Sequence, residues 1–573
     1  MSTFEQRQAA AKRLYYEKEA AQAKGPDNEK DAFRTPQIFR FLTDPQSRGR
    51  LMADVIFAAD WFEHPNVMGR DPRGEADFQA IRLVPLYHVC YDALDETAKA
   101  SLDRFFFDRD YSSIYGSENH ALMYRVARFL AAQFHKGSDR RFTAFGGLTP
   151  EEVYAADKAF IGEFLDFRAK YAWGEFDSLG YAVEILLILA TLFAYTDDDG
   201  LKNKAGMAMD LILLDMIADS RYGLYGGAHG RSYPDAVLDT AHAGMFHVYC
   251  YYFGSRFENL ETLSVPYALL LSPYRPDDIV CAVESGRTYP YLNREVKHLH
   301  SMSSWSGREI NHETLGLLEN CHISKRTYVG ERYMLGGICR QDAYPADCVN
   351  DAGYAHHQQH EWELTLYGGT DHKIFTHHPG DPGYHHIHNR FTGDTGCNCG
   401  TFYQNDNTAI SLYDIKNPHE YPYINAYVPL DVFDEVKKDG KYLFLAYPGL
   451  YISLYFSAGY RVNDFDEYAG REILADGRHH AVILRVEEAD KFASLDAFAG
   501  HIKAIPVCYD PIRRTVAFDG IRVWYDGNGE GGKDNVYPYP YLYENPFMKA
   551  ERGTGRIVVE IGGRRKVYDF GNA

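Results

Sequence analysis

The stretch SENH at 117–120 carries two side chains suited to acid and base chemistry on a sugar. Ser117 is a residue type that caps helix N-termini, so Asn119 and His120 would lie in the first helical turn. The dipole at such an end favours a bound anion and lowers the pKa of an imidazole, which keeps the base neutral. These preferences suit β-elimination of a uronic acid, in which an amide holds the carboxylate while a base removes the proton at C5. We therefore predict that Asn119 binds the carboxylate and that His120 is the base.

Further candidate residues follow in GEFDSLGY and GGAHGRSYP. The phenol of Tyr181 could protonate the leaving glycosidic oxygen or share the role of the base. Arg231 could pair with a carboxylate through two hydrogen bonds, and His229 and Tyr233 lie beside it in the sequence. With Asn119, these side chains could surround one acidic sugar.

Carboxylates near the same stretches leave other reactions open. Glycoside hydrolysis requires two carboxyl groups, about 5 to 10 Å apart, on either side of the bond. Glu118, Glu175, Asp177 and Asp239 could supply such a pair, and the first three could instead contact the substrate. A uronate C5-epimerase would begin with the same proton abstraction as a lyase. A sugar-binding module without turnover fits less well with so many titratable groups.

The elements that position these residues follow from hydrophobic periodicity. Residues 150–173 carry apolar side chains at steps of three and four, which indicates an outer amphipathic helix, whereas 175–195 is apolar nearly all round, as an enclosed inner helix would be. Inner helices are predicted to start near residues 118, 176 and 234, about 58 residues apart, the length of a helical hairpin repeat. Because such hairpins repeat in one sense, the three starts should lie at one end of the array.

After about residue 276 the apolar pattern changes to period two, interrupted by Gly, Asn and Asp, which indicates antiparallel strands. We expect a multidomain α and β protein in which residues 1–275 form an (α/α) toroid with an N-terminal helical extension. Residues 276–573 would form an antiparallel β-sandwich. No linker rich in Pro, Gly or Ser separates the two parts, so we expect them to pack tightly.

The sequence resembles the heparinase II/III and alginate lyase group of polysaccharide lyases. The resemblance lies in an Asn-His pair on one inner helix, a Tyr about sixty residues later on the next, and a toroid followed by a sheet domain. The resemblance implies that Asn119 neutralises the substrate carboxylate and that His120 and Tyr181 act as acid and base. Where that group has a second Asn, this chain has Glu118. A carboxylate there would compete with that of the substrate, which favours the hydrolase alternative.

The resemblance also implies that a histidine of the sheet domain joins the site. The candidates are His312, His322, His356, His357 and His360. The last of them, His360, is predicted to contact the substrate.

The histidine-rich stretch 354–391 could bind a divalent metal such as zinc or calcium. The candidate ligands are His357, His360, Asp371 and His372, which are N and O donors of the kind that zinc accepts. Their spacing fits no short zinc motif, which makes this a weak signal. We expect that the proposed chemistry requires no cofactor. A histidine-rich surface facing a sugar cleft is an equal alternative.

Composition limits the partners. A formal charge of −20 opposes binding to nucleic acid, and it requires that an acidic glycan be short or met by a locally basic cleft. Tyrosine, with 45 residues, favours a carbohydrate partner because flat amphipathic rings stack on sugars. The N-terminus lacks the apolar core of a signal peptide, and no apolar run is long enough to span a bilayer. We expect a cytoplasmic protein with mostly reduced cysteines and no membrane partner, and a homo-oligomer stays open.

Overall fold

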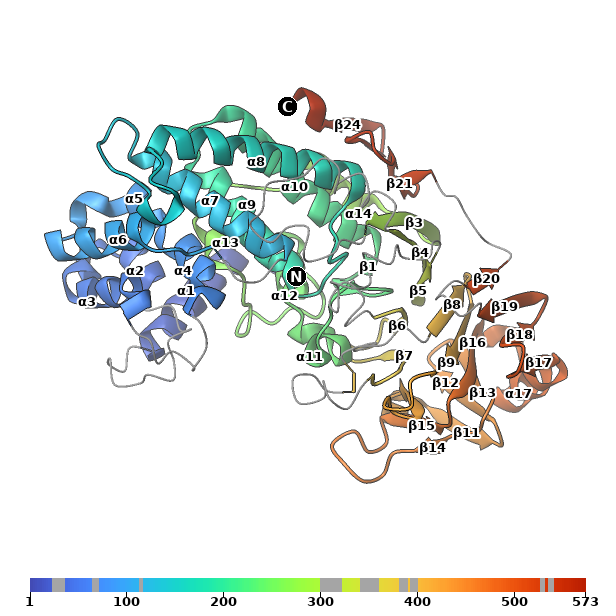
Figure 1. Ribbon diagram of the computed structural model, residues 1–573. Coiled ribbons are helices and arrows are strands. Elements are labelled where there is room, and N and C mark those ends of the chain that lie inside the picture. Colours follow the sequence, from blue (N-terminus) through green and yellow to red (C-terminus); the bar gives the residue numbers. More distant parts are fainter. Residues whose placement is uncertain are drawn as a thin grey trace.

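The computed structural model describes residues 1–22, 37–63, 72–112, 117–298, 322–340, 360–380, 390–391, 400–525, 531–533 and 540–573. In the described part, helices form the N-terminal portion and antiparallel strands the C-terminal portion (Figure 1). This is the mixed α and β organisation predicted from the two periodicities.

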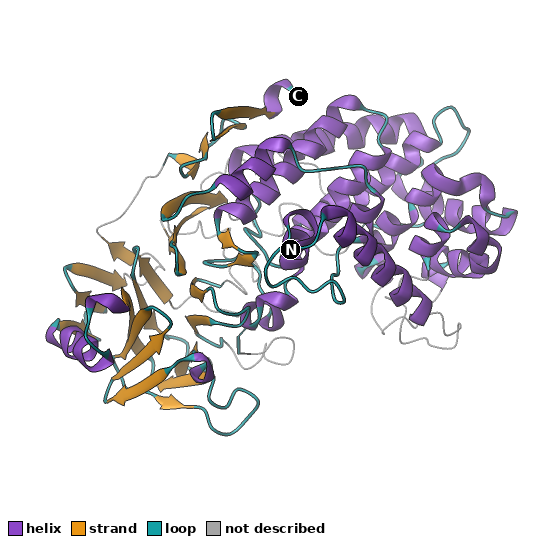
Figure 2. Ribbon diagram, turned by 180° about the vertical axis from the view of Figure 1, so that it is seen from behind, coloured by secondary structure: helices purple, strands orange, loops and turns teal. Residues whose placement is uncertain are grey.

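The longer helices come in the order that the sequence predicts. The helices are α1 (Phe4–Gln22), α2 (Ile38–Thr43), α3 (Arg48–Ala59), α4 (Ala76–Leu83), α5 (Pro85–Cys90), α6 (Glu96–Asp108), α7 (Glu118–Phe134), α8 (Pro150–Tyr171), α9 (Tyr181–Tyr195), α10 (Asp199–Ala218), α11 (Pro234–Leu238), α12 (Gly244–Phe253), α13 (Tyr267–Leu271), α14 (Asp278–Gly286) and, among the strands, α17 (Leu495–Ala504). Seen from behind, the N-terminal helices gather on one side of the molecule (Figure 2).

Local sequence explains where these helices begin. Ser117 caps α7, as predicted, because its side chain accepts a hydrogen bond from the backbone N–H of His120 at 3.5 Å. Thr149 and Glu152 form a capping box at α8, which has Pro150 in its first turn. The helix predicted from residue 175 begins only at Tyr181, because residues 172–180 form a loop with positive φ at Asp177 (50°). The helix predicted to start near residue 234 is divided into α11 and α12.

The strands form four antiparallel sheets among the described residues. They are β1 (Ser220–Arg221), β2 (Leu224–Tyr225), β3 (Tyr291–His298), β4 (His322–Val329), β5 (Tyr333–Arg340), β6 (Trp362–Leu366), β7 (Lys373–His377), β8 (Gly400–Gln404), β9 (Thr408–Asp414), β10 (Tyr423–Tyr427), β11 (Glu435–Asp439), β12 (Tyr442–Tyr447), β13 (Leu450–Phe456), β14 (Arg461–Val462), β15 (Glu472–Asp476), β16 (His479–Glu488), β17 (Val507–Asp510), β18 (Thr515–Phe518), β19 (Ile521–Tyr525), β20 (Gly531–Lys533), β21 (Tyr541–Glu544), β22 (Met548–Glu551), β23 (Arg556–Ile561) and β24 (Arg564–Asp569).

The largest sheet has twelve strands in the order β14-β15-β10-β7-β6-β5-β4-β3-β21-β22-β23-β24. From β8 to β16 the chain alternates between this sheet and a six-stranded sheet, β11-β12-β13-β16-β9-β8, and it then forms a four-stranded sheet, β17-β18-β19-β20. It then returns, and β21 pairs with β3, with Tyr543 opposite Glu295. Figure 1 shows these last strands beside α8 and α14, close to the C-terminus.

Two apolar cores hold the layers together. The first fills the helical part and continues onto the twelve-stranded sheet, where it includes Val329, Met334 and Tyr568. The second lies between the twelve-stranded and six-stranded sheets and includes Leu364 and Leu454. The continuity of the first core confirms the expectation that the two parts pack tightly. Within the described residues, no helix has both the length and the apolar character that crossing a membrane requires.

Candidate active site

The three segments predicted to share one end of the helical array do meet. The carboxylate of Glu118, at the start of α7, accepts hydrogen bonds from the backbone N–H groups of Gly174 (3.1 Å) and Glu175 (2.8 Å). The hydroxyl of Ser178 in turn donates to the carbonyl oxygen of Arg231 at 2.9 Å. The start of α7, the loop 172–180 and the segment before α11 are therefore joined by direct hydrogen bonds.

A connected group of polar side chains lies where these segments meet. Arg231 Nη1 is 2.6 Å from Glu175 Oε1, and the guanidinium lies 4.0 Å from the centre of the Tyr181 ring. The hydroxyls of Tyr181 and Tyr233 are 2.9 Å apart. His120 is close enough for its charge to lower the pKa of Glu175. We call the group of His120, Glu175, Tyr181, Arg231 and Tyr233 the lip. Four of these residues are partly exposed, and His120 is 9% exposed.

His120 is held by a carboxylate that the sequence did not reveal. Its Nδ1 lies 2.5 Å from Oδ2 of Asp77, on α4, which has no exposed surface. Burial alone would lower the pKa of His120, but the charge of Asp77 and the hydrogen bond to it outweigh burial and raise that pKa. The raised pKa makes a neutral imidazole, as the sequence led us to expect for a base, less favourable at this position.

The phenol of Tyr181 keeps its proton. Burial raises the pKa of Tyr181, and the nearby charge of Arg231 opposes this rise without overcoming it. Arg231 remains a cation, since the charge of Glu175 offsets its burial and raises its pKa. Arg231 also has a φ of 41°, so the chain turns sharply there and the side chains of His229 and Arg231 face different surroundings.

The side chain of Glu118 has a structural role. Besides its two backbone partners, its Oε2 lies 3.2 Å from Nη1 of Arg168, and only 1% of the residue is exposed. Glu175 differs, because its side chain retains 12% exposure and Arg231 binds only one of its oxygens. Burial raises the pKa of Glu175, although Arg231 lowers it in part.

Asn119 lies behind the lip rather than on it. The residue has no exposed surface, and its Oδ1 accepts a hydrogen bond from the hydroxyl of Ser117. Within the described residues, its Nδ2 has no hydrogen-bond partner. This amide is a buried donor with unused capacity, and it does not reach the surface that His120 reaches.

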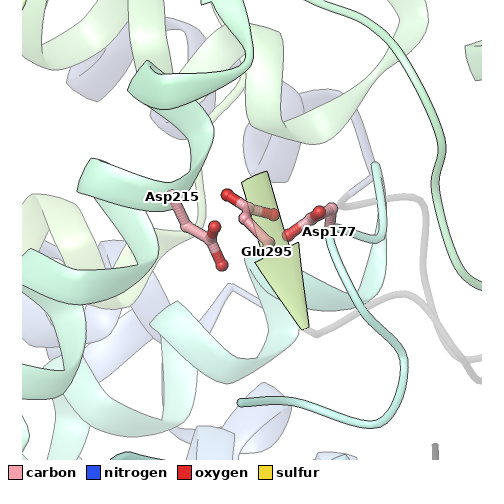
Figure 3. A group of neighbouring side chains, drawn as sticks. All are labelled: Asp177, Asp215 and Glu295. Carbon is pink, nitrogen blue, oxygen red and sulfur yellow. The ribbon is translucent and has the colours of Figure 1, made fainter. Parts of the chain in front are cut away.

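Asp177 belongs to a buried charge cluster instead of the lip. Its carboxylate gathers with those of Asp215, on α10, and Glu295, on β3, within 4.8 Å of one another, as three metal ligands would (Figure 3). Lys297 Nζ lies 3.1 Å from Asp177, 2.6 Å from Asp215 and 3.1 Å from Glu295. The ammonium group therefore occupies the position in which a cation would satisfy these carboxylates.

A second lysine extends the cluster. Lys325, on β4, pairs with Asp177 and Asp219, and Asn293 donates to Asp219 at 2.8 Å. Burial raises the pKa of Asp219 to about 6, even though Lys325 lowers it. The cluster consists of six charged side chains: Asp177, Asp215, Asp219, Glu295, Lys297 and Lys325. It connects the loop 172–180 and the C-terminal end of α10 to β3 and β4, and so it holds the helical part against the sheet.

His229 and His360 face each other beneath the lip. Their backbones form an isolated antiparallel bridge with hydrogen bonds of 2.9 and 2.8 Å. Their rings are stacked, with the ring centres 5.9 Å apart. His229 Nδ1 donates to the carbonyl oxygen of Asp177 at 2.8 Å, and burial, with Lys325 next in effect, lowers its pKa to about 3. Its ring is therefore neutral. Within the described residues its Nε2 has no hydrogen-bond partner.

Both ring nitrogens of His360 are occupied. Nε2 is 3.0 Å from Glu363, and Nδ1 is 2.9 Å from Nε2 of His377. Because burial lowers the pKa of both histidines, they are neutral, so His360 donates to Glu363 and His377 donates to His360. His360 has no exposed surface, and the structure does not bring it to the lip.

Two of the predicted metal ligands, Asp371 and His372, lie 3.8 Å apart, but among the described residues they do not form a group of three possible ligands with His360. Asp371 is 2.7 Å from Arg471, and His372 Nδ1 is 2.8 Å from the hydroxyl of Tyr447, whereas His360 has the partners given above. His357 lies outside the described residues, as do His312 and His356, and the side chain of His322 is not described. Asp239, proposed for a hydrolytic pair, accepts from the backbone of Ala241 at 2.9 Å.

Glu184 is a second residue that the sequence reasoning missed. It lies on α9 three residues after Tyr181, a spacing that places two side chains on one face of a helix. Burial raises its pKa, while the charges of Arg82 and His120 lower it. The helical spacing from Tyr181 is the signal that could have identified it.

No known family model matches the sequence, and no curated protein matches it. One of the similar solved structures is a Paenibacillus xanthan lyase. The two structures have a TM-score of 0.40 and 11% sequence identity over 97% of this chain and 63% of the xanthan lyase chain. The chain thus spans less than two thirds of the length of that lyase. The helices and antiparallel sheets of the described residues are the element types expected from the resemblance to that group.

Proposed function

We propose that the protein cleaves a uronate-containing oligosaccharide by β-elimination at the lip. The observation that carries this proposal is the hydrogen-bonded pair of phenols, Tyr181 and Tyr233, beneath the guanidinium of Arg231. Such a pair can remove one proton and deliver another on the same side of a sugar ring, which is what syn elimination across a glycosidic bond requires.

Positive charge at the lip would bind the carboxylate. His120 favours its charged form because of Asp77, and Arg231 keeps its charge beside Glu175. Hydrogen bonds from these cations to the carboxylate stabilise the negative charge that develops when C5 loses its proton. In this proposal His120 is a carboxylate-binding cation and not the base.

The proton transfers are assigned to the two phenols. Tyr181 is the acid, since burial raises its pKa, and this proposal gives Tyr233 the role of the base. Tyr233 takes the C5 proton, the C5–H electron pair forms the C4=C5 double bond, and the C4–O bond breaks as Tyr181 protonates the leaving oxygen. The 2.9 Å hydrogen bond then allows the proton to pass from Tyr233 to Tyr181, which restores the starting pair.

Hydrolysis has weaker support. Of the four carboxylates considered for it, Glu118 is paired with Arg168, Asp177 with two lysines, and Asp239 with the backbone. Glu175 is the member of that set that faces the lip. A C5-epimerase would use the same lip residues and would return the proton to the opposite face of C5.

One assay separates these reactions. The protein is incubated with short acidic and neutral oligosaccharides, and three signals are followed: the ultraviolet absorbance of an unsaturated uronate, new reducing ends and deuterium exchange at C5. Elimination gives the absorbance together with reducing ends. Reducing ends without absorbance would establish hydrolysis, and exchange alone would establish epimerisation, so that either result would overturn the proposal.

A further inference from the structure

A groove on the helical part begins beside the lip. It borders about 1490 Å³ of free space and is lined by α1, α4 and α9 and by residues between 235 and 267, with Lys18, Arg82 and Glu184 among its walls. Glu184 lies three residues after Tyr181 on α9, and the charge of His120 acts on it. The groove therefore starts within one helical turn of the phenol pair.

The charges of this groove differ from those of the chain as a whole. The net charge of the protein is −20, yet the groove carries Lys18 and Arg82 against Glu184 and Asp235. Burial raises the pKa of Glu184, so this carboxyl group tends toward its neutral form and cancels less of the positive charge. An acidic ligand would thus meet two cations on walls that are less negative than the chain as a whole.

Arg82 is the cation best placed for a ligand. It is partly exposed at the end of α4, and among the described residues it has neither a hydrogen-bond partner nor a carboxylate within 4.0 Å. Its charge acts on Tyr15 and Tyr267, whose rings are 6.0 Å apart, and both tyrosines line the groove. A partly buried guanidinium without a partner has the geometry to bind an oxyanion through two hydrogen bonds.

We propose that this groove binds the sugar next to the cleaved uronate and that Arg82, with Lys18, pairs with an anionic group on that sugar. The inference rests on the proposed function. It specifies the substrate class as a short oligosaccharide with acidic groups on neighbouring sugars, whose anion is a carboxylate or a sulfate ester. Tyr15 offers a ring against which the same sugar can stack.

The test compares substrates and variants. Trisaccharides of one backbone carry a uronate at the cleaved position and, on the neighbouring sugar, a hydroxyl, a carboxylate or a sulfate. They are given to the wild type, Arg82→Gln, Arg82→Lys and the control Arg13→Gln, which removes an exposed arginine of α1 that pairs with Glu17. The two doubly acidic substrates show which anion the groove prefers.

We expect Arg82→Gln to raise KM for the preferred doubly acidic substrate about tenfold, because a charge-assisted hydrogen bond is lost, and to leave kcat unchanged. The KM for the singly acidic substrate should not change, Arg82→Lys should recover part of the loss, and Arg13→Gln should match the wild type. An equal change for all three substrates would show a structural effect and overturn the proposal, as would no change for any.

The outcomes also distinguish this inference from the proposed function. Cleavage by the wild type with no effect of Arg82→Gln overturns the groove assignment alone. Calorimetric binding of the doubly acidic trisaccharide that is lost in Arg82→Gln, without cleavage by the wild type, overturns the lyase proposal alone. Neither binding nor cleavage of any acidic trisaccharide by the wild type overturns both.

Discussion

The carboxylate of Asp77 contacts Nδ1 of His120 at 2.5 Å, inside a protein environment that leaves Asp77 with no exposed surface and His120 with 9%. The two residues come from different helices, α4 and α7, so this contact fixes the position of the first turn of α7 as well as the charge of its imidazole. A buried anion that raises the pKa of a histidine gives the lip a group whose positive charge depends on pH.

Asp77→Asn should move the alkaline limit of activity to lower pH. If charged His120 binds the substrate carboxylate, activity is present below its pKa and lost as pH rises through it. Asp77 raises that pKa against burial, and an amide cannot. The pH dependence of kcat/KM checks this, with exposed Asp92→Asn as control. An alkaline limit that stays in place would rule out the role of His120 as a required cation.

Tyr181→Phe and Tyr233→Phe should each lower kcat by about 10²- to 10⁴-fold, the usual contribution of one acid or base. Each substitution removes one hydroxyl of the 2.9 Å pair and keeps the ring. The double variant should be little worse than either single one, because the two phenols act as a unit. Steady-state kinetics on one oligosaccharide, with Tyr442→Phe in the sheet domain as control, measure this. Independent, multiplicative losses would contradict the shared proton transfer.

Lys297→Ala should lower the free energy of unfolding by about 3 to 5 kcal/mol, because it leaves buried carboxylates without their counter-charge. The remaining triad of Asp177, Asp215 and Glu295 has oxygen atoms within 4.8 Å of one another. Calcium prefers oxygen ligands, so added Ca²⁺ should raise the melting temperature of this variant and leave the wild type unchanged. Thermal unfolding with and without chelator tests this, with exposed Lys549→Ala as control. A wild type that chelator destabilises would contradict the role assigned to Lys297.

Acid should destabilise the fold partly through His229. Its pKa is about 3 in the folded protein against an ordinary value of 6.5, so between these values the unfolded chain binds the additional proton. The free energy of unfolding then falls as pH decreases from about 6.5, by at most about 1.4 kcal/mol per pH unit for this one group. Asp219, with its pKa raised from 3.8 to about 6, contributes in the opposite direction.

The substitution His229→Gln shows how much of the pH dependence of the free energy of unfolding comes from this imidazole. Urea unfolding of the wild type and His229→Gln is compared at several pH values between about 6.5 and about 4. The variant should show a shallower loss of stability on acidification. Identical slopes for the two proteins would mean that His229 does not titrate as its burial requires.

Much of the architecture could be predicted from local sequence. The amphipathic pattern at 150–173 identifies α8, and Ser117 identifies the start of α7, because both signals act within a few residues. The loop before Tyr181 could not be found in the same way. Its backbone is held by Glu118, which lies more than fifty residues earlier, so an apolar pattern that extends to residue 175 does not reveal where the helix begins.

The candidate site was predicted only in part, because some of its contacts are also between residues far apart in the sequence. The segments with Tyr181, Arg231 and Tyr233 were expected to meet at the start of α7, and they do. Asp77 was missed, since its contact with His120 spans 43 residues and nothing near either residue indicates it.

The buried charge cluster could have been predicted in part from the sequence. Asn293, Glu295 and Lys297 alternate along β3 and therefore share one face of the sheet. Three polar residues at that spacing on a strand next to the helical part indicate a buried polar interface.

The pairing of β21 with β3 also affects how the chain is made. The strand that completes β3 is β21, which follows the six-stranded and four-stranded sheets in the chain, so the twelve-stranded sheet keeps an open edge at β3 until β21 has been made. The apolar core of the helical part is completed at the same stage, because Leu542, Met548 and Tyr568 belong to it. A chain without residues 540–573 would leave that edge and those apolar contacts uncovered.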